Sequence, residues 1–335
     1  MTRREWFRKA ASAACAACSF SAWGAGRDAT SILQSSSAPT PRLKSPFQLS
    51  VITDEISQDF EHALNIAAHE FGLKWVEVRT LWNKNIVNLD TKELTKTRRL
   101  LDKYSVKVTD VGSPLFKVEW PGAPKSEYAP KDFQSHTDFT YARQDEVLER
   151  AIEAGKTLGT NRVRCFDFWR LDDQKPHRAA IDERLRTAAQ KAEKQGAVLL
   201  LENEYACNTA TGVEAARTLQ AVQSAAFLLN WDPGNAAFRG EVAYPTGYAP
   251  IPKNRIAHMH LKDVRKKPDG TYEWEAMGRG LIDYTGQFKA LLKDGYTGTM
   301  SLETHWNGGG SPEECSRQSM AGTQELLRKA GALTT

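Results

Sequence analysis

The sequence predicts an α/β protein that folds as a single (β/α)8 TIM barrel, and three observations lead to this prediction. Strand-like and helix-like stretches alternate eight times from residue 47 onward, with short breakers between them, which is the pattern of parallel βα units. No GxGxxG turn follows the first strand, where DEISQDF stands instead, so an open dinucleotide-binding sheet is disfavoured. Polar groups collect at the strand ends, as they do on the active face of a barrel.

The expected strands are short apolar runs bounded by turn signals. They cover residues 49–55, 74–80, 106–112, 162–168, 197–204, 226–232, 256–263 and 298–304. Helices are expected where apolar residues recur at three- and four-residue spacing. They cover residues 60–71, 91–104, 143–159, 181–196, 212–223, 284–295 and 313–330. Two longer segments, 116–140 and 238–254, contain Pro, Gly and aromatic residues, and we expect them to cover the active face as lids or substrate walls.

The barrel is assigned to residues 47–335, and a chain of 335 residues can bury the core that such a domain needs. Residues 26–46, rich in Ser, Ala, Pro and Thr, are expected to be a flexible linker. Residues 1–25 have the layout of a signal peptide, with Arg3 and Arg4 ahead of the apolar stretch AASAACAACSFSAW. Paired arginines at this place are typical of twin-arginine (Tat) export.

This N-terminal segment also limits the partners of the protein. Its apolar stretch is shorter than the roughly 20 residues that a membrane span needs, so no stable membrane anchor is expected. Removal of the signal would lower the formal net charge of +4, and a nearly neutral protein is a poor binder of nucleic acid. We expect a periplasmic or secreted bacterial protein that binds a small-molecule sugar or sugar derivative, and we leave assembly into a homo-oligomer open.

Four ionisable residues stand where the last four apolar runs end. They are Glu202, Asp232, His260 and Glu303. Burying such a group costs several kcal/mol unless it is paired or bound to a metal. Each one alone is better explained as a salt bridge or a helix cap, but four at matching places predict a metal centre. Three carboxylates and one imidazole suit Mn²⁺ or Mg²⁺, with Co²⁺ or Zn²⁺ tolerated.

Further inward-facing candidates follow from the two-residue alternation of strands. Lys262 shares the parity of His260 and would stabilise negative charge or act as a general acid or base, unless it turns outward to pair with Asp263. Other polar residues near the strand ends are candidates for contacts with a substrate. These are Glu77, Arg79, Asn235, His258, Arg265 and His305.

From residue 49 to the last helix, the sequence resembles the xylose isomerase-like barrel superfamily of sugar isomerases and epimerases. The most specific pieces are HMHLKD at 258–263, the run from GRGLIDY to MSLE at 278–303, and LLLENE around Glu202. The resemblance implies that the four residues named above bind the metal. In the 3-epimerases of this family the two metal-bound glutamates also exchange the proton, which would give base and acid roles to Glu202 and Glu303.

The implied activity is a divalent-metal-dependent isomerisation or epimerisation of a sugar, by proton abstraction next to a carbonyl through an enediolate that the ion stabilises. Expulsion of a β-leaving group from the same enediolate would instead make a lyase or dehydratase acting on a keto-sugar or 3-keto-glycoside. A sugar-binding barrel without catalysis is the third alternative. Asn235 and Asn208 stand where the ketose 3-epimerases carry a His and a Glu, which disfavours a free ketohexose as the substrate.

The export prediction can be tested by replacing Arg3 and Arg4 with lysine, which keeps the charge but removes the paired guanidinium groups that a twin-arginine signal requires. We expect the double variant to stay in the cytoplasm when cells are fractionated. The matched control is Arg8→Lys, which should be exported normally. Unchanged periplasmic recovery of the double variant would contradict the prediction.

Overall fold

A computed structural model describes residues 44–129 and 139–334 of the chain. The predicted signal peptide and most of the predicted linker lie outside the described residues, as does part of the expected lid at 116–140. In the part of the chain that is described, no helix combines the length and the apolar character that a membrane crossing requires.

Eight parallel strands form the wall of a nearly closed barrel, which confirms the predicted fold. In spatial order around the sheet they are β1 (Gln48–Val51), β12 (Thr299–Leu302), β9 (Ile256–Leu261), β8 (Phe227–Trp231), β7 (Val198–Glu202), β6 (Arg162–Cys165), β5 (Lys107–Leu115) and β2 (Trp75–Val78). A parallel bridge between Ile52 and Glu77 joins the two end strands. Every strand stands in the predicted place, because continuous apolar runs identify strands that are buried on both faces.

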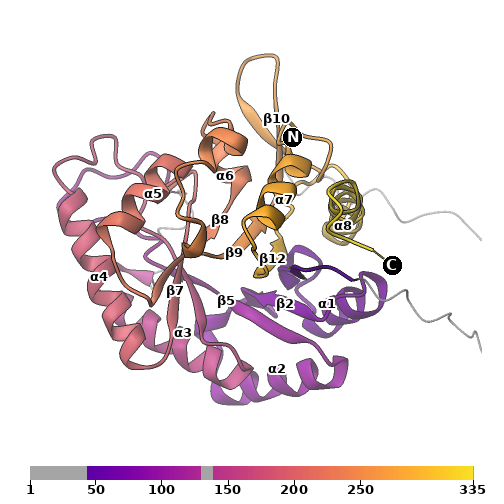
Figure 1. The fold of residues 1–335 in the computed structure, drawn as a ribbon. Coiled ribbons are helices and arrows are strands. Elements are labelled where there is room, and N and C mark those ends of the chain that lie inside the picture. The colour runs from indigo at the N-terminus through magenta and orange to yellow at the C-terminus, as the bar shows by residue number, and fades with distance from the viewer. Residues whose placement is uncertain (1–43, 130–138, 335) are drawn as a thin grey trace, which may run out of the picture. The chain divides into compact units, whose positions relative to one another are not determined.

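Helices cover the outside of the strands (Figure 1). In the described residues they are α1 (Phe60–Asn65), α2 (Thr91–Tyr104), α3 (Gln144–Leu158), α4 (Arg178–Lys194), α5 (Gly212–Ala221), α6 (Pro233–Phe238), α7 (Tyr284–Lys293) and α8 (Pro312–Lys329). The sequence did not predict α6, because six residues are too few to show a helical period. Its start is nevertheless well defined: Asp232 accepts a hydrogen bond from the backbone N–H of Asn235 at 2.9 Å, and Pro233 occupies the first turn.

A hairpin after β9 was also missed by the sequence analysis, which assigned no element to residues 264–283. Its strands are β10 (Asp263–Lys266) and β11 (Tyr272–Glu275), which pair antiparallel, and it projects from the barrel in Figure 1. The buried carboxylate of Asp263 anchors it by accepting the backbone N–H groups of Val264 at 3.0 Å, Gly278 at 3.1 Å and Gly280 at 3.0 Å. One acidic side chain therefore fixes both ends of the hairpin.

Replacing Asp263 with alanine should destabilise the protein by about 2–4 kcal/mol, because the buried N–H group of Val264 and the partly buried N–H groups of Gly278 and Gly280 would lose their acceptor. Urea unfolding of the metal-free protein would measure this change. Asp269→Ala is the matched control, since Asp269 lies in the same hairpin with a side chain that is 62% exposed. Equal unfolding midpoints for the two variants would show that Asp263 does not anchor the hairpin.

Candidate metal centre

The structure brings the four predicted ligands together at one end of the barrel. Glu202 ends β7, Asp232 follows β8, His260 lies in β9 and Glu303 follows β12, and the carboxyl ends of parallel strands share one face. One donor atom from each residue lies within 4.8 Å of all the others. Nδ1 of His260 is 3.2 Å from Oε1 of Glu202 and 3.0 Å from Oε2 of Glu303. All four side chains are buried.

Two asparagines hold the ligands in place. The side-chain amide of Asn235 donates to Oε1 of Glu202 at 3.2 Å and to Oδ2 of Asp232 at 3.1 Å. Asn203 exchanges two hydrogen bonds with the backbone of Asp232, at 2.7 and 2.8 Å. Asn235 is fully buried, and its side-chain amide links two of the predicted ligands.

Lys262 points into the same group of carboxylates. Its Nζ lies 2.9 Å from Oδ2 of Asp232 and 3.7 Å from Oε1 of Glu202, and it also donates a hydrogen bond to Glu303. Burial would lower the pKa of Lys262, but the carboxylates of Asp232 and Glu303 outweigh it and raise the pKa well above its usual value. The outward alternative, a salt bridge with Asp263, is wrong, because Asp263 is turned toward the hairpin.

Two arginines reach the same centre. Nη1 of Arg164 lies 3.2 Å from Oε2 of Glu202. Arg79 donates to Oε1 of Glu303 at 2.6 Å and to Glu55 at 2.8 Å. Arg164 was not predicted as part of the site. The signal for it was a cation inside the buried strand RVRCFDF, because an unpaired charge at such a place is strongly disfavoured.

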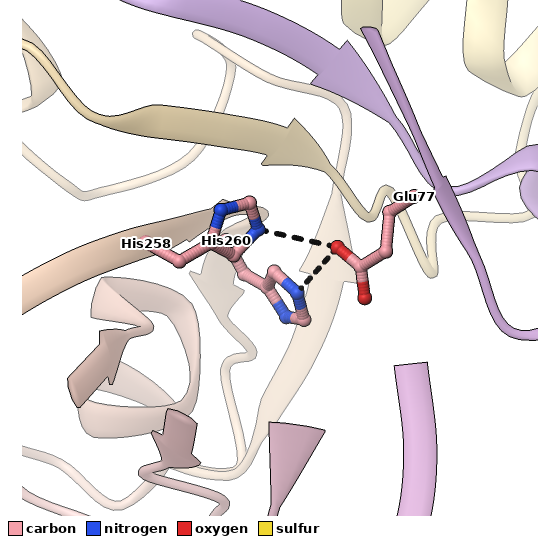
Figure 2. Close-up of side chains that lie close together, drawn as sticks. All are labelled: Glu77, His258 and His260. Carbon is pink, nitrogen blue, oxygen red and sulfur yellow. Dashed lines mark hydrogen bonds and ion pairs between the residues drawn. The ribbon is translucent and has the colours of Figure 1, made fainter. Parts of the chain in front are cut away.

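The imidazole of His260 shows that the centre fits a cation. Its Nε2 lies 3.0 Å from Oε2 of Glu77 (Figure 2), and because a carboxylate only accepts hydrogen bonds, this nitrogen carries the hydrogen. Nδ1 then faces Glu202 and Glu303, and an acceptor nitrogen beside carboxylates needs a proton or a metal ion between them. Burial would lower the pKa of His260, but Glu77 and Glu202 outweigh it and raise the pKa well above its usual value.

A cavity of about 290 Å³ lies beside this centre. Charged groups on its wall include Arg79, Arg164, Glu303 and Lys117, whose Nζ lies 2.9 Å from Oε2 of Glu204. Aromatic side chains also line it, namely Tyr128, Phe166, Trp169 and Tyr205. Polar groups beside aromatic faces are typical of sites that bind small molecules.

The predicted substrate contacts divide into two groups. Arg79 and His305 line the cavity, and Nε2 of His305 lies 3.3 Å from Oε1 of Glu303. The other four do not line the cavity, and their contacts with a substrate stay predictions. Glu77, Asn235 and His258 are fully buried, whereas Arg265 is an exposed hairpin residue paired with Glu273. The alternation of the strands predicted correctly which side chains point inward. It did not predict their layer along the barrel axis, because inward side chains of a barrel stack in several layers.

Comparison with known proteins shows the family to which the chain belongs. The model of the xylose isomerase-like TIM barrel family matches residues 66–328, so the chain belongs to that family. An inosose dehydratase of Geobacillus thermodenitrificans is 26% identical over 228 residues, which cover 64% of this chain and 73% of that protein.

Two solved structures share the fold of this chain. The IOLI protein with a bound zinc atom has a TM-score of 0.67 at 17% identity, over 85% of this chain and 99% of that chain. An L-ribulose 3-epimerase has a TM-score of 0.60 at 17% identity, over 85% and 96%. At this level of identity the two structures support the fold alone.

Metal binding should depend on pH. Burial raises the pKa of Asp232 to about 6, although Lys262 opposes the shift. A carboxylate must lose its proton to bind a metal, so affinity for Mn²⁺ should fall by about tenfold or more for each pH unit below about 6. Protonation of His260 acts in the same direction. Isothermal titration calorimetry at several pH values would measure this, and an affinity that is unchanged between about pH 5 and 6 would contradict it.

Proposed function

We propose that the protein is a divalent-metal-dependent isomerase or epimerase of a sugar or a sugar-like polyol. The observation that carries this proposal is the pair of glutamates at one centre. Glu202 and Glu303 come from different strands and both approach the metal-facing nitrogen of His260, at 3.2 and 3.0 Å. Two carboxylates around one reacting carbon are the groups that a proton transfer next to a carbonyl requires.

The side chains of the centre have separate roles in this proposal. A bound divalent ion would polarise the substrate carbonyl and make the neighbouring C–H more acidic. Glu303 lines the cavity, and although burial opposes it, Lys262 and His305 hold the pKa of its carboxyl well below its usual value. Glu303 is therefore ionised, which is the state in which a carboxylate can accept a proton. Glu202 is the second exchange group, with a pKa of about 2 because His260 and Arg164 outweigh burial and the neighbouring Glu303.

The cofactor in this proposal is Mn²⁺ or Mg²⁺, with Co²⁺ or Zn²⁺ as alternatives. Three carboxylates supply hard oxygen donors, and the imidazole accommodates any of the four ions. The IOLI protein, which shares the fold of this chain, contains a bound zinc atom, and this supports a divalent ion as the cofactor. Export to the periplasm or beyond also remains a proposal, and it rests only on Arg3 and Arg4 in the N-terminal segment.

A lyase or dehydratase is the second candidate, and Lys262 is the observation that favours it. Its ammonium donates a hydrogen bond to Glu303 and forms an ion pair with Asp232, so a proton donor lies beside the proposed base. A donor at this place would protonate a departing hydroxyl or glycosidic oxygen, after the same proton abstraction. The likeness to an inosose dehydratase supports this candidate, with a cyclic keto-polyol, a keto-sugar or a 3-keto-glycoside as substrate.

Proton NMR in D₂O separates these functions. The protein is loaded with Mg²⁺ or Mn²⁺ and incubated with ketoses, aldoses, inososes and 3-keto-glycosides, with and without a chelator. Chelator-sensitive deuterium incorporation together with a new epimer or isomer is expected. Loss of water or of an alcohol would establish the lyase, and binding without any exchange would leave only a sugar-binding role.

The same assay tests the two glutamates. Glu202→Gln and Glu303→Gln should each lower the rate of deuterium exchange by about 10²- to 10⁴-fold, because an amide cannot accept the proton. Glu183→Gln is the matched control, since Glu183 is a solvent-exposed residue of α4, and it should exchange at the parental rate. Activity of either active-site variant within a few-fold of the parent would refute the assigned role.

A further inference from the structure

Below the metal centre, a series of polar contacts begins at the partly buried Arg162 and continues through buried residues of the barrel. Nη1 of Arg162 donates to Oγ1 of Thr299 at 3.2 Å, and Thr299 is hydrogen-bonded to Nδ1 of His258. Nε2 of His258 lies 3.2 Å from Oε2 of Glu77. The same oxygen of Glu77 lies 3.0 Å from Nε2 of His260, and Figure 2 shows both imidazoles converging on it.

The direction of each hydrogen bond follows from the chemistry of the groups. A guanidinium can only donate, so the hydroxyl of Thr299 accepts from Arg162. It donates its own hydrogen to Nδ1 of His258, which is the acceptor nitrogen of a neutral ring whose Nε2 carries the hydrogen. A carboxylate can only accept, so Nε2 of His258 carries a hydrogen and donates it to Glu77. In this series of hydrogen bonds each donor then meets an acceptor, and a tautomer is assigned on that basis.

The contact with Glu77 also determines which nitrogen of His260 carries the hydrogen. Its Nε2 must also donate to Glu77, so when the ring is neutral its lone pair lies on Nδ1. That nitrogen faces Glu202, Glu303 and, at 3.8 Å, Oδ2 of Asp232. Glu77 therefore determines which nitrogen of His260 is offered to an ion, although Glu77 itself is oriented toward the two imidazoles.

Packing fixes the position of the Glu77 carboxylate. Its side chain is fully buried, and the neighbouring strand approaches closely at Gly112. A Cβ at that position would lie 3.1 Å from Oε1 of Glu77 and 3.0 Å from Cβ of Arg79. In the described part of the chain Oε1 has no hydrogen-bond partner. The cation nearest to Oε1 is Nη1 of Arg164, at 3.9 Å, so the hydrogen bonds of the carboxylate are those of Oε2 to the two imidazoles.

We propose that Glu77 is a positioning residue of the metal centre. It holds His260 in the tautomer and ring orientation that presents Nδ1 to the ion, while His258, Thr299 and Arg162 keep Glu77 in place. Carboxylates that accept the second N–H of a metal-binding histidine raise the basicity of the ligand, and their loss typically weakens metal binding by about 10- to 100-fold. The inference rests on the proposed metal dependence and adds a residue that does not touch the substrate.

The first test uses the unaltered protein with Zn²⁺, which is diamagnetic. Long-range ¹H–¹⁵N NMR of the imidazoles should show His260 with a hydrogen on Nε2 and the metal on Nδ1. The reverse pattern would overturn the inference. If no divalent ion binds at all, the proposed function fails, and that result is distinct from binding through the wrong nitrogen.

The second test compares Glu77→Gln with Asp110→Asn by calorimetric titration of Zn²⁺ and Co²⁺. Asp110 is also fully buried, but it approaches the other histidine, with Oδ1 3.6 Å from Nε2 of His258. We expect about 10- to 100-fold weaker binding for Glu77→Gln, with a changed Co²⁺ absorption spectrum, and parental affinity for Asp110→Asn.

Equal affinities for the two variants would overturn the inference. Two ions per chain, one of them lost in Glu77→Gln, would also overturn it, because Glu77 would then be a ligand itself. Circular dichroism shows whether each variant folds. If Glu77→Gln does not fold, the NMR experiment on the unaltered protein still decides the question.

Discussion

The structure depends on the burial of an excess of carboxylates at one end of the barrel. Glu202, Asp232 and Glu303 are each at most 2% exposed and share one centre. Three cations offset part of this charge: Lys262 lies 2.9 Å from Asp232, Arg164 lies 3.2 Å from Glu202, and Arg79 lies 2.6 Å from Glu303. Arg79 also pairs with a fourth carboxylate, that of Glu55, at 2.8 Å. Buried ions of one sign repel each other strongly in a medium of low dielectric constant. This end of the barrel is therefore built to hold further positive charge.

That requirement explains why a rigid scaffold surrounds the site. The predicted ligands come from strands that lie side by side in the order β12, β9, β8 and β7, so their distances are set by the hydrogen bonds of the sheet. Asn235 and Asn203 then restrict Asp232, and Glu77 restricts His260. Each group that would bind the ion is held by a neighbour that does not, which lowers the cost of ordering the site when a cation arrives.

The sequence predicted the strands well because buried parallel strands are apolar throughout and end abruptly at the active face. It predicted the four-residue centre for the same reason, since an ionisable group after such a run is conspicuous. Short elements were missed, as α6 and the β10–β11 hairpin show. The position of side chains along the barrel axis was not predicted either. Glu77 and His258 point inward, as expected, but the alternation of a strand does not reveal which layer of the barrel a side chain occupies.

The position of Lys262 connects the metal centre with the choice of reaction. Oδ2 of Asp232 and Oε2 of Glu303 each lie near both the ammonium of Lys262 and Nδ1 of His260. A lysine and a divalent ion would therefore compete for the same oxygens. An ion would take over the charge that the lysine balances and weaken its hold on these carboxylates. The ammonium would then be available to the substrate. In both candidate reactions of the proposed function, Glu303 would abstract the proton. A leaving oxygen within reach of Lys262 would then favour elimination, whereas without such an oxygen the proton would return to carbon.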